Sequence, residues 1–533
     1  MNYSKYTLCP SCPFLLLVLI FFSSFLQAQN LPVVWLDDDW PGPWRGTEAE
    51  PCSSLQQLFR AGPNQTPIVE NYTQTGIIII LKPGIYNSTN FNLANDFFQS
   101  GFNATHKTFI FRATTHFNQN PNTTGRNPNS SSEVRITDMG AIPTQTGLSN
   151  TFIFEGFTFE GTSFRLPSGG FHKVILRNNI FTGNITSIAQ FTSIATLELT
   201  QNRIIGATFS NTALLEAAEI NHVHIQANEF LGVNTTLPNI LILKDCRNIV
   251  FQRNSFLNFN PVANNSIIEI VGGNNTLSAT LQENSFTNSI TNFFNAYGCI
   301  YLENTPQIVI ERNRVNNISV ATIPPLPTLT QRPFFFAVNS SNNTTSRATV
   351  IDNIVTNSNC NGGIIRLEGI FFSEIKSNLI ALTNNANNSS ALIQILGGNK
   401  TIIQSNTFQN ILAAGNLNAA CIRIGAQFPA AQPNAADSSI VQNNVITQIG
   451  SITETGNANG IIIWGGKFHL IENNTLSSSY GISGITIIAR GLSSGVNTYI
   501  RNNSLIRVRG NRILLLGQVS GILENNTIYD YDP

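Results

Sequence analysis

The chain has 533 residues, of which 42% are hydrophobic and only 11% are charged, and 29 Lys and Arg balance 29 Asp and Glu. A net charge of zero, with no basic patch and no polybasic stretch, argues against a nucleic-acid partner and against binding to anionic lipid. This length would ordinarily predict several domains, but a repeat protein grows in one dimension and remains one domain.

Residues 1–28 predict a signal peptide. Lys5 gives a weak positive start, and an apolar segment of about twelve residues runs from Phe14 to Phe25. Cleavage near Ala28 fits, although Leu26 is larger than the residue preferred two positions earlier. An uncleaved signal anchor is the alternative, but the segment is short for a spanning helix. No later stretch is long enough to span a membrane, so we expect a secreted protein.

Residues 29–75 predict an N-terminal cap. Within it, Asp37, Asp38 and Asp39 stand beside Trp40 and offer carboxylate oxygens to a calcium ion. A solvated acidic turn is the alternative that we favour, so we expect no cofactor and no metal.

From residue 76 the chain consists of short β-branched runs separated by Gly, Asn and Ser, which predicts β-strands. A polar segment in the first, less regular part, Asn118–Ser132, predicts a mobile loop. Further on, one pattern recurs thirteen times: an apolar residue, two positions, an asparagine, one position, and an apolar residue. The asparagines are Asn179, Asn202, Asn228, Asn254, Asn284, Asn313, Asn353, Asn378, Asn406, Asn444, Asn474, Asn503 and Asn526.

The spacing of these asparagines averages about 29 residues, which predicts one coil of two or three short strands per repeat, stacked in parallel on the next. Asparagine tolerates the left-handed backbone region, so we expect it at a tight bend between two strands. Stacked in register, the side-chain amides can bond to one another along the stack. The flanking apolar residues would then form ladders inside the coil.

Three features together resemble the pectin-lyase-like superfamily of right-handed parallel β-helices. Ser53 to Gly62 (SSLQQLFRAG) resembles its amphipathic capping helix, Gly76 to Tyr86 (GIIIILKPGIY) resembles its first-coil strand ending in Pro-Gly-x-Tyr, and the repeat completes the likeness. The resemblance implies an all-β, single-domain right-handed parallel β-helix over residues 76–533 behind a short capping helix. It implies no activity, because this fold carries lyases, hydrolases, adhesins and inert surface proteins.

The catalytic motifs of that superfamily are missing from the repeats. Pectate lyases use clustered carboxylates for calcium with an Arg or Lys base, and polygalacturonases use Asn-Thr-Asp, paired Asp, Gly-His-Gly and Arg-Ile-Lys. The repeats hold only three scattered aspartates, Asp245, Asp352 and Asp437. No catalytic subfamily matches, and we lean against an enzyme.

Strand alternation predicts one outward face that could form a site. Five isoleucines should point inward: Ile268, Ile300, Ile365, Ile393 and Ile422. Between them, an outward column should hold Glu269, Tyr301, Arg366, Gln394 and Arg423. The next outward positions include Lys244, Glu303, Glu368 and Trp464. Two long excursions, Ala321–Arg332 and Ala426–Ser438, flank this face, and loops on a rigid scaffold often carry specificity.

This face has three interpretations. The first is an active site. Glu303 and Glu368 would lie two coils apart, about 9.6 Å, which is at the edge of the range for an inverting carboxylate pair. Arg366 and Arg423 are further catalytic candidates. Alternatively, Glu269, Tyr301, Gln394 and Trp464 contact a bound glycan. The third interpretation is an exposed sheet with polar cover, in which Glu–Arg pairs contribute little.

Two histidines two positions apart, His222 and His224, share a strand face and could bind a metal, but no third ligand is evident from the sequence on neighbouring coils, so solvated histidines are favoured.

Cysteine spacing predicts free thiols. Cys52, Cys246, Cys299, Cys360 and Cys421 remain after the signal. Cys299 and Cys421 would lie four coils apart, about 19 Å, which is beyond disulfide reach. One bridge of Cys360 through its loop stays open.

Twenty Asn-x-Ser/Thr sequons follow the signal segment and predict a glycoprotein if the host glycosylates. They include Asn64, Asn71, Asn87, Asn184, Asn234, Asn317, Asn473, Asn502 and Asn525, and the last three each precede a repeat asparagine, where the alternation predicts an outward side chain. We therefore expect a secreted, glycosylated β-helix at the cell surface or matrix, non-catalytic and structural or glycan-contacting. A polysaccharide lyase or glycoside hydrolase with a diverged site is the alternative. The sequence indicates neither the ligand nor the oligomeric state.

Overall fold

A computed structural model describes residues 31–529 apart from a set of internal gaps. The gaps are 43–44, 60–75, 94–106, 140–149, 162–170, 186–188, 210–212, 233, 236–238, 259, 262–265, 292–298, 321–332, 340–342, 359–362, 383, 386–390, 414–419, 426–436, 450–458, 480–482, 489–495 and 509. The predicted signal peptide, the excursion 321–332, most of the excursion 426–438, and Cys360 lie outside the described residues.

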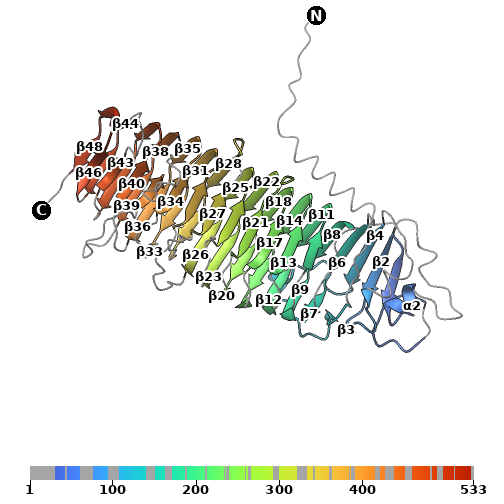
Figure 1. The fold of residues 1–533 in the computed structure, drawn as a ribbon. Coiled ribbons are helices and arrows are strands. Elements are labelled where there is room, and N and C mark those ends of the chain that lie inside the picture. Colours follow the sequence, from blue (N-terminus) through green and yellow to red (C-terminus); the bar gives the residue numbers. More distant parts are fainter. Residues whose placement is uncertain are drawn as a thin grey trace, which may run out of the picture.

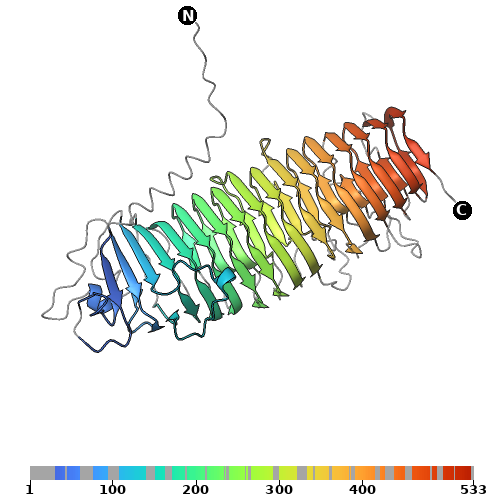
Figure 2. The same ribbon diagram turned by 180° about the vertical axis from the view of Figure 1, so that it is seen from behind.

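The described chain winds into a long rod of three parallel sheets, with the two ends of the chain at opposite ends of the rod (Figure 1, Figure 2). Each strand pairs in parallel with its equivalent in the next coil, as Leu199 does with Ile225. The predicted parallel β-helix is therefore confirmed.

A 17-stranded sheet runs the whole length of the described rod. Its strands are β1 (Val33–Leu36), β2 (Gly76–Leu81), β4 (Thr108–Ala113), β6 (Asn150–Glu155), β8 (Phe171–Arg177), β11 (Thr196–Thr200), β14 (His222–Gln226), β18 (Asn248–Gln252), β22 (Ser278–Gln282), β25 (Gln307–Glu311), β28 (Arg347–Ile351), β31 (Phe372–Lys376), β35 (Lys400–Gln404), β38 (Ser438–Gln442), β41 (Phe468–Glu472), β44 (Val496–Arg501) and β47 (Val519–Glu524).

A 12-stranded sheet precedes it within each coil. Its strands are β10 (Ala189–Thr192), β13 (Ala213–Ala218), β17 (Asn239–Lys244), β21 (Ile268–Val271), β24 (Ile300–Glu303), β27 (Phe335–Val338), β30 (Ile365–Glu368), β34 (Ala391–Leu396), β37 (Ala420–Ile424), β40 (Asn459–Trp464), β43 (Ser483–Ile488) and β46 (Asn511–Leu516).

The remaining nineteen strands form the third sheet, and some coils contribute two short pieces to it. From β9 onward these strands follow the bend at the repeat asparagine. They are β3 (Gly84–Tyr86), β5 (Val134–Ile136), β7 (Thr158–Glu160), β9 (Ile180–Ile185), β12 (Arg203–Phe209), β15 (Glu229–Leu231), β16 (Asn234–Thr235), β19 (Ser255–Leu257), β20 (Asn260–Pro261), β23 (Ser285–Thr291), β26 (Arg314–Val320), β29 (Ile354–Thr356), β32 (Leu379–Ala381), β33 (Asn384–Asn385), β36 (Thr407–Ala413), β39 (Val445–Ile449), β42 (Thr475–Ser479), β45 (Ser504–Val508) and β48 (Thr527–Tyr529).

The N-terminal end of the rod is covered by its own elements. Strand β1 pairs with β2, and the short helix α2 (Leu55–Phe59) buries Leu55, Leu58 and Phe59 against the core. This helix lies inside the segment that resembled a capping helix. A second short helix, α3 (Pro121–Thr124), lies in the polar segment before β5. Within the described residues, neither helix has the length or hydrophobicity needed to cross a bilayer.

The predicted interior ladders are confirmed. Phe230, Phe256 and Phe286 occupy one position on successive coils, and their rings stack with centroids 4.4 and 4.9 Å apart. The apolar residues on both sides of each repeat asparagine are buried in all coils except the last. Each coil therefore supplies only a slice of core and depends on its neighbours to cover it.

The repeat asparagines form a continuous buried ladder. Asn284 is typical: its backbone N–H and its Nδ2 both donate to Asn313 Oδ1, at 3.0 and 2.9 Å, and Nδ2 also donates to the Phe251 carbonyl at 2.9 Å. Equivalent amide-to-amide bonds join all thirteen asparagines, and only Asn526 is not fully buried. The ladder satisfies polar groups that the bend would otherwise leave unpaired in the core.

The expectation that the ladder asparagines adopt the left-handed region is wrong. The residue before each of them does so, with φ between 52° and 57°. These residues are Asn178, Gln201, Ala227, Arg253, Glu283, Arg312, Asp352, Ser377, Ser405, Asn443, Asn473, Asn502 and Asn525. The bend is made one position earlier, which turns the following amide inward to bond along the stack.

The prediction that the cysteines form no disulfides is confirmed for the four cysteines that the structure describes. Cys52, Cys246, Cys299 and Cys421 are buried and form no disulfide among the described residues. Burial raises the pKa of the Cys246 thiol to about 11, so this thiol stays protonated and unreactive at neutral pH.

Replacing a ladder asparagine should cost more stability than replacing a surface asparagine. Asn313→Ala removes the acceptor of Asn284 and leaves buried donors unpaired, so we expect the free energy of unfolding to fall by about 3 kcal/mol. Asn316→Ala removes a partly exposed acceptor of Thr356 and Asn357, whose donors can turn to water, and should cost less than about 1 kcal/mol. Equal losses in urea-induced unfolding would contradict the ladder's role.

Relieving the left-handed bend should stabilise the rod. Ala227 has φ 54°, a conformation that costs an L-residue about 1–2 kcal/mol and glycine almost nothing. After the extra chain entropy that glycine loses on folding, Ala227→Gly should raise the free energy of unfolding by up to about 1 kcal/mol. Ala217→Gly, a change at a buried strand position, should lower it. If the denaturation midpoints of Ala227→Gly and Ala217→Gly shifted in the same direction, the left-handed bend at Ala227 would not be a source of strain.

Candidate functional site

The outward column predicted on the 12-stranded sheet exists and contains one further residue. Strand register places Glu269 beside Tyr301, and Tyr301 beside Phe336, which then lies beside Arg366. Gln394 and Arg423 continue the column on the next two strands. The five isoleucines expected to point inward are buried in the core.

Aromatic and charged side chains of this column contact one another across strands. The rings of Tyr301 and Phe336 lie 5.4 Å apart, and the Arg366 guanidinium lies 5.0 Å from the centre of the Phe336 ring. Such a cation over an aromatic face is attracted by the ring quadrupole. The column is therefore a packed stack of side chains rather than a row of independent ones.

Both candidate carboxylates are bonded within this stack. The Tyr301 hydroxyl donates to Glu303 Oε2 at 3.1 Å, and an Arg366 NH group donates to Glu368 Oε2 at 3.0 Å. Glu303 and Glu368 share a column with Val338 between them, so they lie two coils apart as predicted, or roughly 9.6 Å by strand spacing. That separation lies at the edge of the range for an inverting pair, and each carboxylate accepts a bond within the stack.

Several side chains of the outward column are buried from solvent. Strand alternation predicts the direction of a side chain but not whether other residues cover it. Tyr301, Gln394 and Arg423 are only 5%, 2% and 4% exposed although they point away from the core. Part of the cover is the column's own packing, since Tyr301 lies against Phe336 and Trp464 packs on Ile462. A ligand could reach the partly exposed members first: Glu269, Glu303, Arg366, Glu368 and Trp464.

The cationic half of the column is poorly solvated. Burial, and then the nearby Arg366 cation, lower the pKa of Arg423 to about 9. Gln394 lies between the two arginines in register, and its Oε1 and the Arg366 Nε have no hydrogen-bond partner within the described part of the chain. Arg366, two strands away in register, thus disfavours the protonated form of Arg423.

The histidine pair gains a neighbour that the sequence did not indicate. Register places Glu198 beside His224, but the Glu198 carboxylate already pairs with Lys173 at 2.6 Å. Burial lowers the pKa of His224, whereas His222 is exposed. Neither histidine belongs to a group of three clustered metal-ligating side chains among the residues described.

Three carboxylates do cluster in the cap. Asp37, Asp38 and Asp39 offer oxygens within 4.8 Å of one another. Asp37 lies 3.5 Å from Lys82 Nζ, and Asp38 accepts a bond from the Ile85 backbone N–H at 2.8 Å. Burial raises the pKa of both Asp37 and Asp38. Two of these carboxylates therefore already tie the cap to the first coil.

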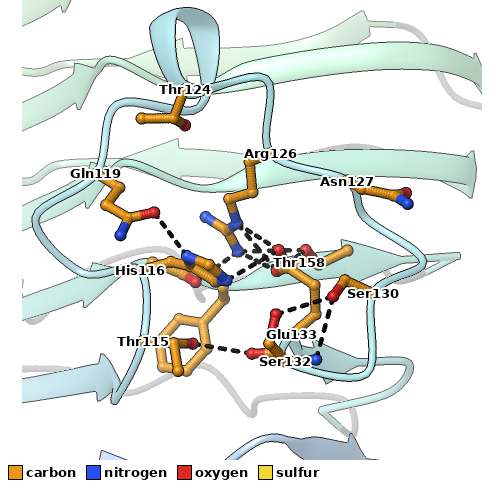
Figure 3. Close-up of polar contacts among 12 residues, drawn as sticks. Thr115, His116, Gln119, Thr124, Arg126, Asn127, Ser130, Ser132, Glu133 and Thr158 are labelled. Carbon is orange, nitrogen blue, oxygen red and sulfur yellow. Dashed lines mark hydrogen bonds and ion pairs between the residues drawn. The ribbon is translucent and has the colours of Figure 1, made fainter.

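A buried ion-pair cluster of Arg126, Glu133, Thr158 and His116 lies on the N-terminal coils (Figure 3). The side chains of Arg126 and Glu133 are 1% and 0% exposed and form a charge pair, and Thr158 Oγ1 donates to Glu133 at 2.7 Å. The His116 Nε2 lies 3.3 Å from Glu133, outside hydrogen-bond geometry.

The same cluster fixes the segment that we expected to be mobile. Arg126 donates to the carbonyls of Gly156 and Asn178 at 2.6 and 2.8 Å, and Asn122 Nδ2 donates to the Ala227 carbonyl at 2.9 Å. Residues 114–133 are thus packed along the left-handed bends of several coils. The only signal in the sequence is that Arg126 and Glu133 stand seven residues apart in a sparsely charged segment.

Breaking this cluster should strongly destabilise the N-terminal coils. Arg126→Ala leaves Glu133 buried without its cation, which costs about 3–5 kcal/mol. Arg135→Ala breaks a partly exposed pair with Glu160 and should cost less than about 1 kcal/mol. Hydrogen exchange should accelerate in residues 114–133 only in the first variant; unchanged exchange there would show that the ion pair does not hold the segment.

Comparison with known proteins reveals no close relative. No protein-family model matches the chain, and no curated protein matches its sequence. The structure is similar to a GH136 lacto-N-biosidase from Eubacterium ramulus at 9% identity over 96% of this chain and 70% of that chain, with a TM-score of 0.24. It is also similar to a GH87 alpha-1,3-glucanase catalytic domain in complex with nigerose, at 8% identity over 87% of this chain and 68% of that chain, with a TM-score of 0.23. A third similar structure is the PL6 family alginate lyase AlyGC, at 10% identity over 86% of this chain and 98% of that chain, with a TM-score of 0.22. These neighbours are glycan-acting enzymes, but likeness at this level assigns neither activity nor substrate to this chain.

Proposed function

We propose that this protein is a secreted, glycosylated β-helix that binds an acidic polysaccharide without cleaving it. The ligand would lie along the outer face of the 12-stranded sheet, across β24, β27 and β30. The observation that carries this proposal is the stack of Tyr301, Phe336 and Arg366, in which two largely buried rings support a partly exposed cation, with Glu303 and Glu368 bonded to the stack.

The chemistry of this stack suits an acidic sugar. Arg366 is partly exposed, and its guanidinium group, which already donates to Glu368, can donate a further bond to a carboxylate. The poorly solvated Arg423 two strands away adds positive charge. Glu303 and Glu368 can accept bonds from hydroxyl groups, and Trp464 lies on β40, three strands beyond Glu368 in the same sheet.

Secretion and glycosylation are supported by sequence and exposure together. The signal-like segment precedes a chain rich in sequons, and Asn473, Asn502 and Asn525 are exposed at successive bends. Asn339, another sequon asparagine, is buried and its Nδ2 donates to Ser346 and Gly369, so the folded chain could not carry a glycan there.

A lyase or hydrolase is the less favoured alternative. Its candidate groups Glu303, Glu368 and Arg366 are bonded within the stack, and the spacing of the two carboxylates lies at the edge of the range for an inverting pair. Arg423 is almost fully buried.

Removal of the stacked cation should weaken acidic-glycan binding. Arg366→Ala deletes a charge-assisted contact of about 1.5–3 kcal/mol, so the dissociation constant for oligogalacturonate or oligomannuronate should rise at least about tenfold. Binding would be measured by isothermal titration calorimetry at two salt concentrations, with a neutral cello-oligosaccharide as the reference ligand.

A matched control lies on the 17-stranded sheet. Arg347 lies 4.6 Å from the Phe372 ring and 3.7 Å from Glu374, an equivalent cation, ring and carboxylate arrangement. Arg347→Ala should leave binding unchanged. Equal losses in both variants, or no binding of any acidic oligosaccharide by the parent chain, would refute the proposal. Release of products that stops in Glu303→Gln would establish the enzyme instead.

A further inference from the structure

The last coil of the described rod exposes residues that every earlier coil buries. It consists of β46, β47 and β48, each of which pairs with a preceding strand on one side only. Six of its large apolar side chains are 39–61% exposed: Leu515, Leu516, Ile522, Leu523, Ile528 and Tyr529. Large contiguous apolar surfaces of this kind mark interaction sites.

Three of these six occupy core positions. Leu515 lies in register with Ile487, Leu523 with Ile500, and Ile528 with Leu505. All three partners in the preceding coil are buried, at 0–1% exposure. The core of the rod is therefore open at this end, together with the unpaired backbone groups of three strand edges.

The asparagine ladder is open at the same end. Each earlier ladder asparagine donates its backbone N–H to the Oδ1 of the next, as Asn503 does to Asn526 at 3.1 Å. Asn526 is the last, so no ladder oxygen within the described residues is left for its own N–H. A cover for this end must supply both apolar surface and hydrogen-bonding groups.

The other end of the rod cannot serve as that cover. Strand β1 and helix α2 close it, and the first ladder residue, Asn179, already accepts a bond from the Phe157 backbone N–H at 3.0 Å. Stacking of one chain's last coil on the first coil of another is therefore blocked, and with it an open filament.

We infer that the last coil is the interface of a two-fold dimer in which two copies of this chain meet end to end through β46, β47 and β48. A two-fold axis across the rod places β47 against β47 of the second copy in antiparallel pairing, which satisfies both edges. The second copy offers the same apolar surface and the same unpaired strand edges, so the contact closes on itself.

The exposed area sets an upper limit on such a contact. With roughly 180 Å² for a fully exposed large side chain, the six half-exposed ones offer at most about 500 Å² per copy. Two copies that covered all six would bury about 1,000 Å² before the backbone is counted, which is the size of the smallest specific interfaces.

Sedimentation velocity and small-angle scattering of the 533-residue chain test this inference. We expect a concentration-dependent dimer with nearly twice the maximum dimension of the monomer. Asn525 carries a sequon in the same coil, so the measurement is made before and after removal of N-linked glycans. A monomer throughout the micromolar range in both preparations, or an open series of higher oligomers, would overturn the inference.

Variants then locate the interface. Leu523→Asp should raise the dimer dissociation constant at least about tenfold, and Tyr529→Lys, a change at a 61% exposed side chain, should do so without touching the core. Leu382→Asp is the matched control, because Leu382 is 53% exposed against 55% for Leu523 but lies mid-rod. Circular dichroism confirms that each variant is folded. A dimer that survives Tyr529→Lys and Leu523→Asp, or one that Leu382→Asp disrupts equally, would place the contact elsewhere.

Discussion

The bend before each repeat asparagine is the constraint on which the whole rod depends. A residue in the left-handed region turns the chain, and the asparagine that follows places its amide inside, where it bonds to the coils on both sides. Left-handed backbone is unfavourable for most residues, yet Gln201, Ala227 and Arg253 adopt it here. The buried amide ladder and the stacked apolar residues beside it must offset that cost in every coil.

This constraint also places the side chains of the candidate site. Because the ladder fixes the register of every coil, a residue's distance from its ladder asparagine decides whether it faces the core or the outside, and which residue of the next coil lies beside it. Tyr301, Phe336 and Arg366 become neighbours in this way although more than thirty residues separate Tyr301 from Phe336 in sequence. A rigid sheet holds them in place, so a ligand would meet a preformed surface. The same dependence on neighbours explains why the last coil, which lacks one, exposes its core positions.

Sequence patterns predicted the direction of side chains better than their surroundings. The fold, the interior ladders and the outward column followed from local periodicity. Phe336 was missed because it stands in a run of three phenylalanines, where alternation is masked. The burial of Tyr301 and Gln394 depends on packing across the sheet, which no local pattern contains. Likewise, the bond from Arg126 to Asn178 joins residues 52 positions apart, and no spacing rule predicts it.

The central claim about function concerns where a ligand lies on the rod. Hydrogen exchange with and without a saturating acidic oligosaccharide tests it most directly, because slow exchange can be located strand by strand. We expect added protection only in β24, β27, β30 and the segments that flank them. Protection on the 17-stranded sheet alone, or at the cap beside Asp37, with none on β27 and β30, would contradict it.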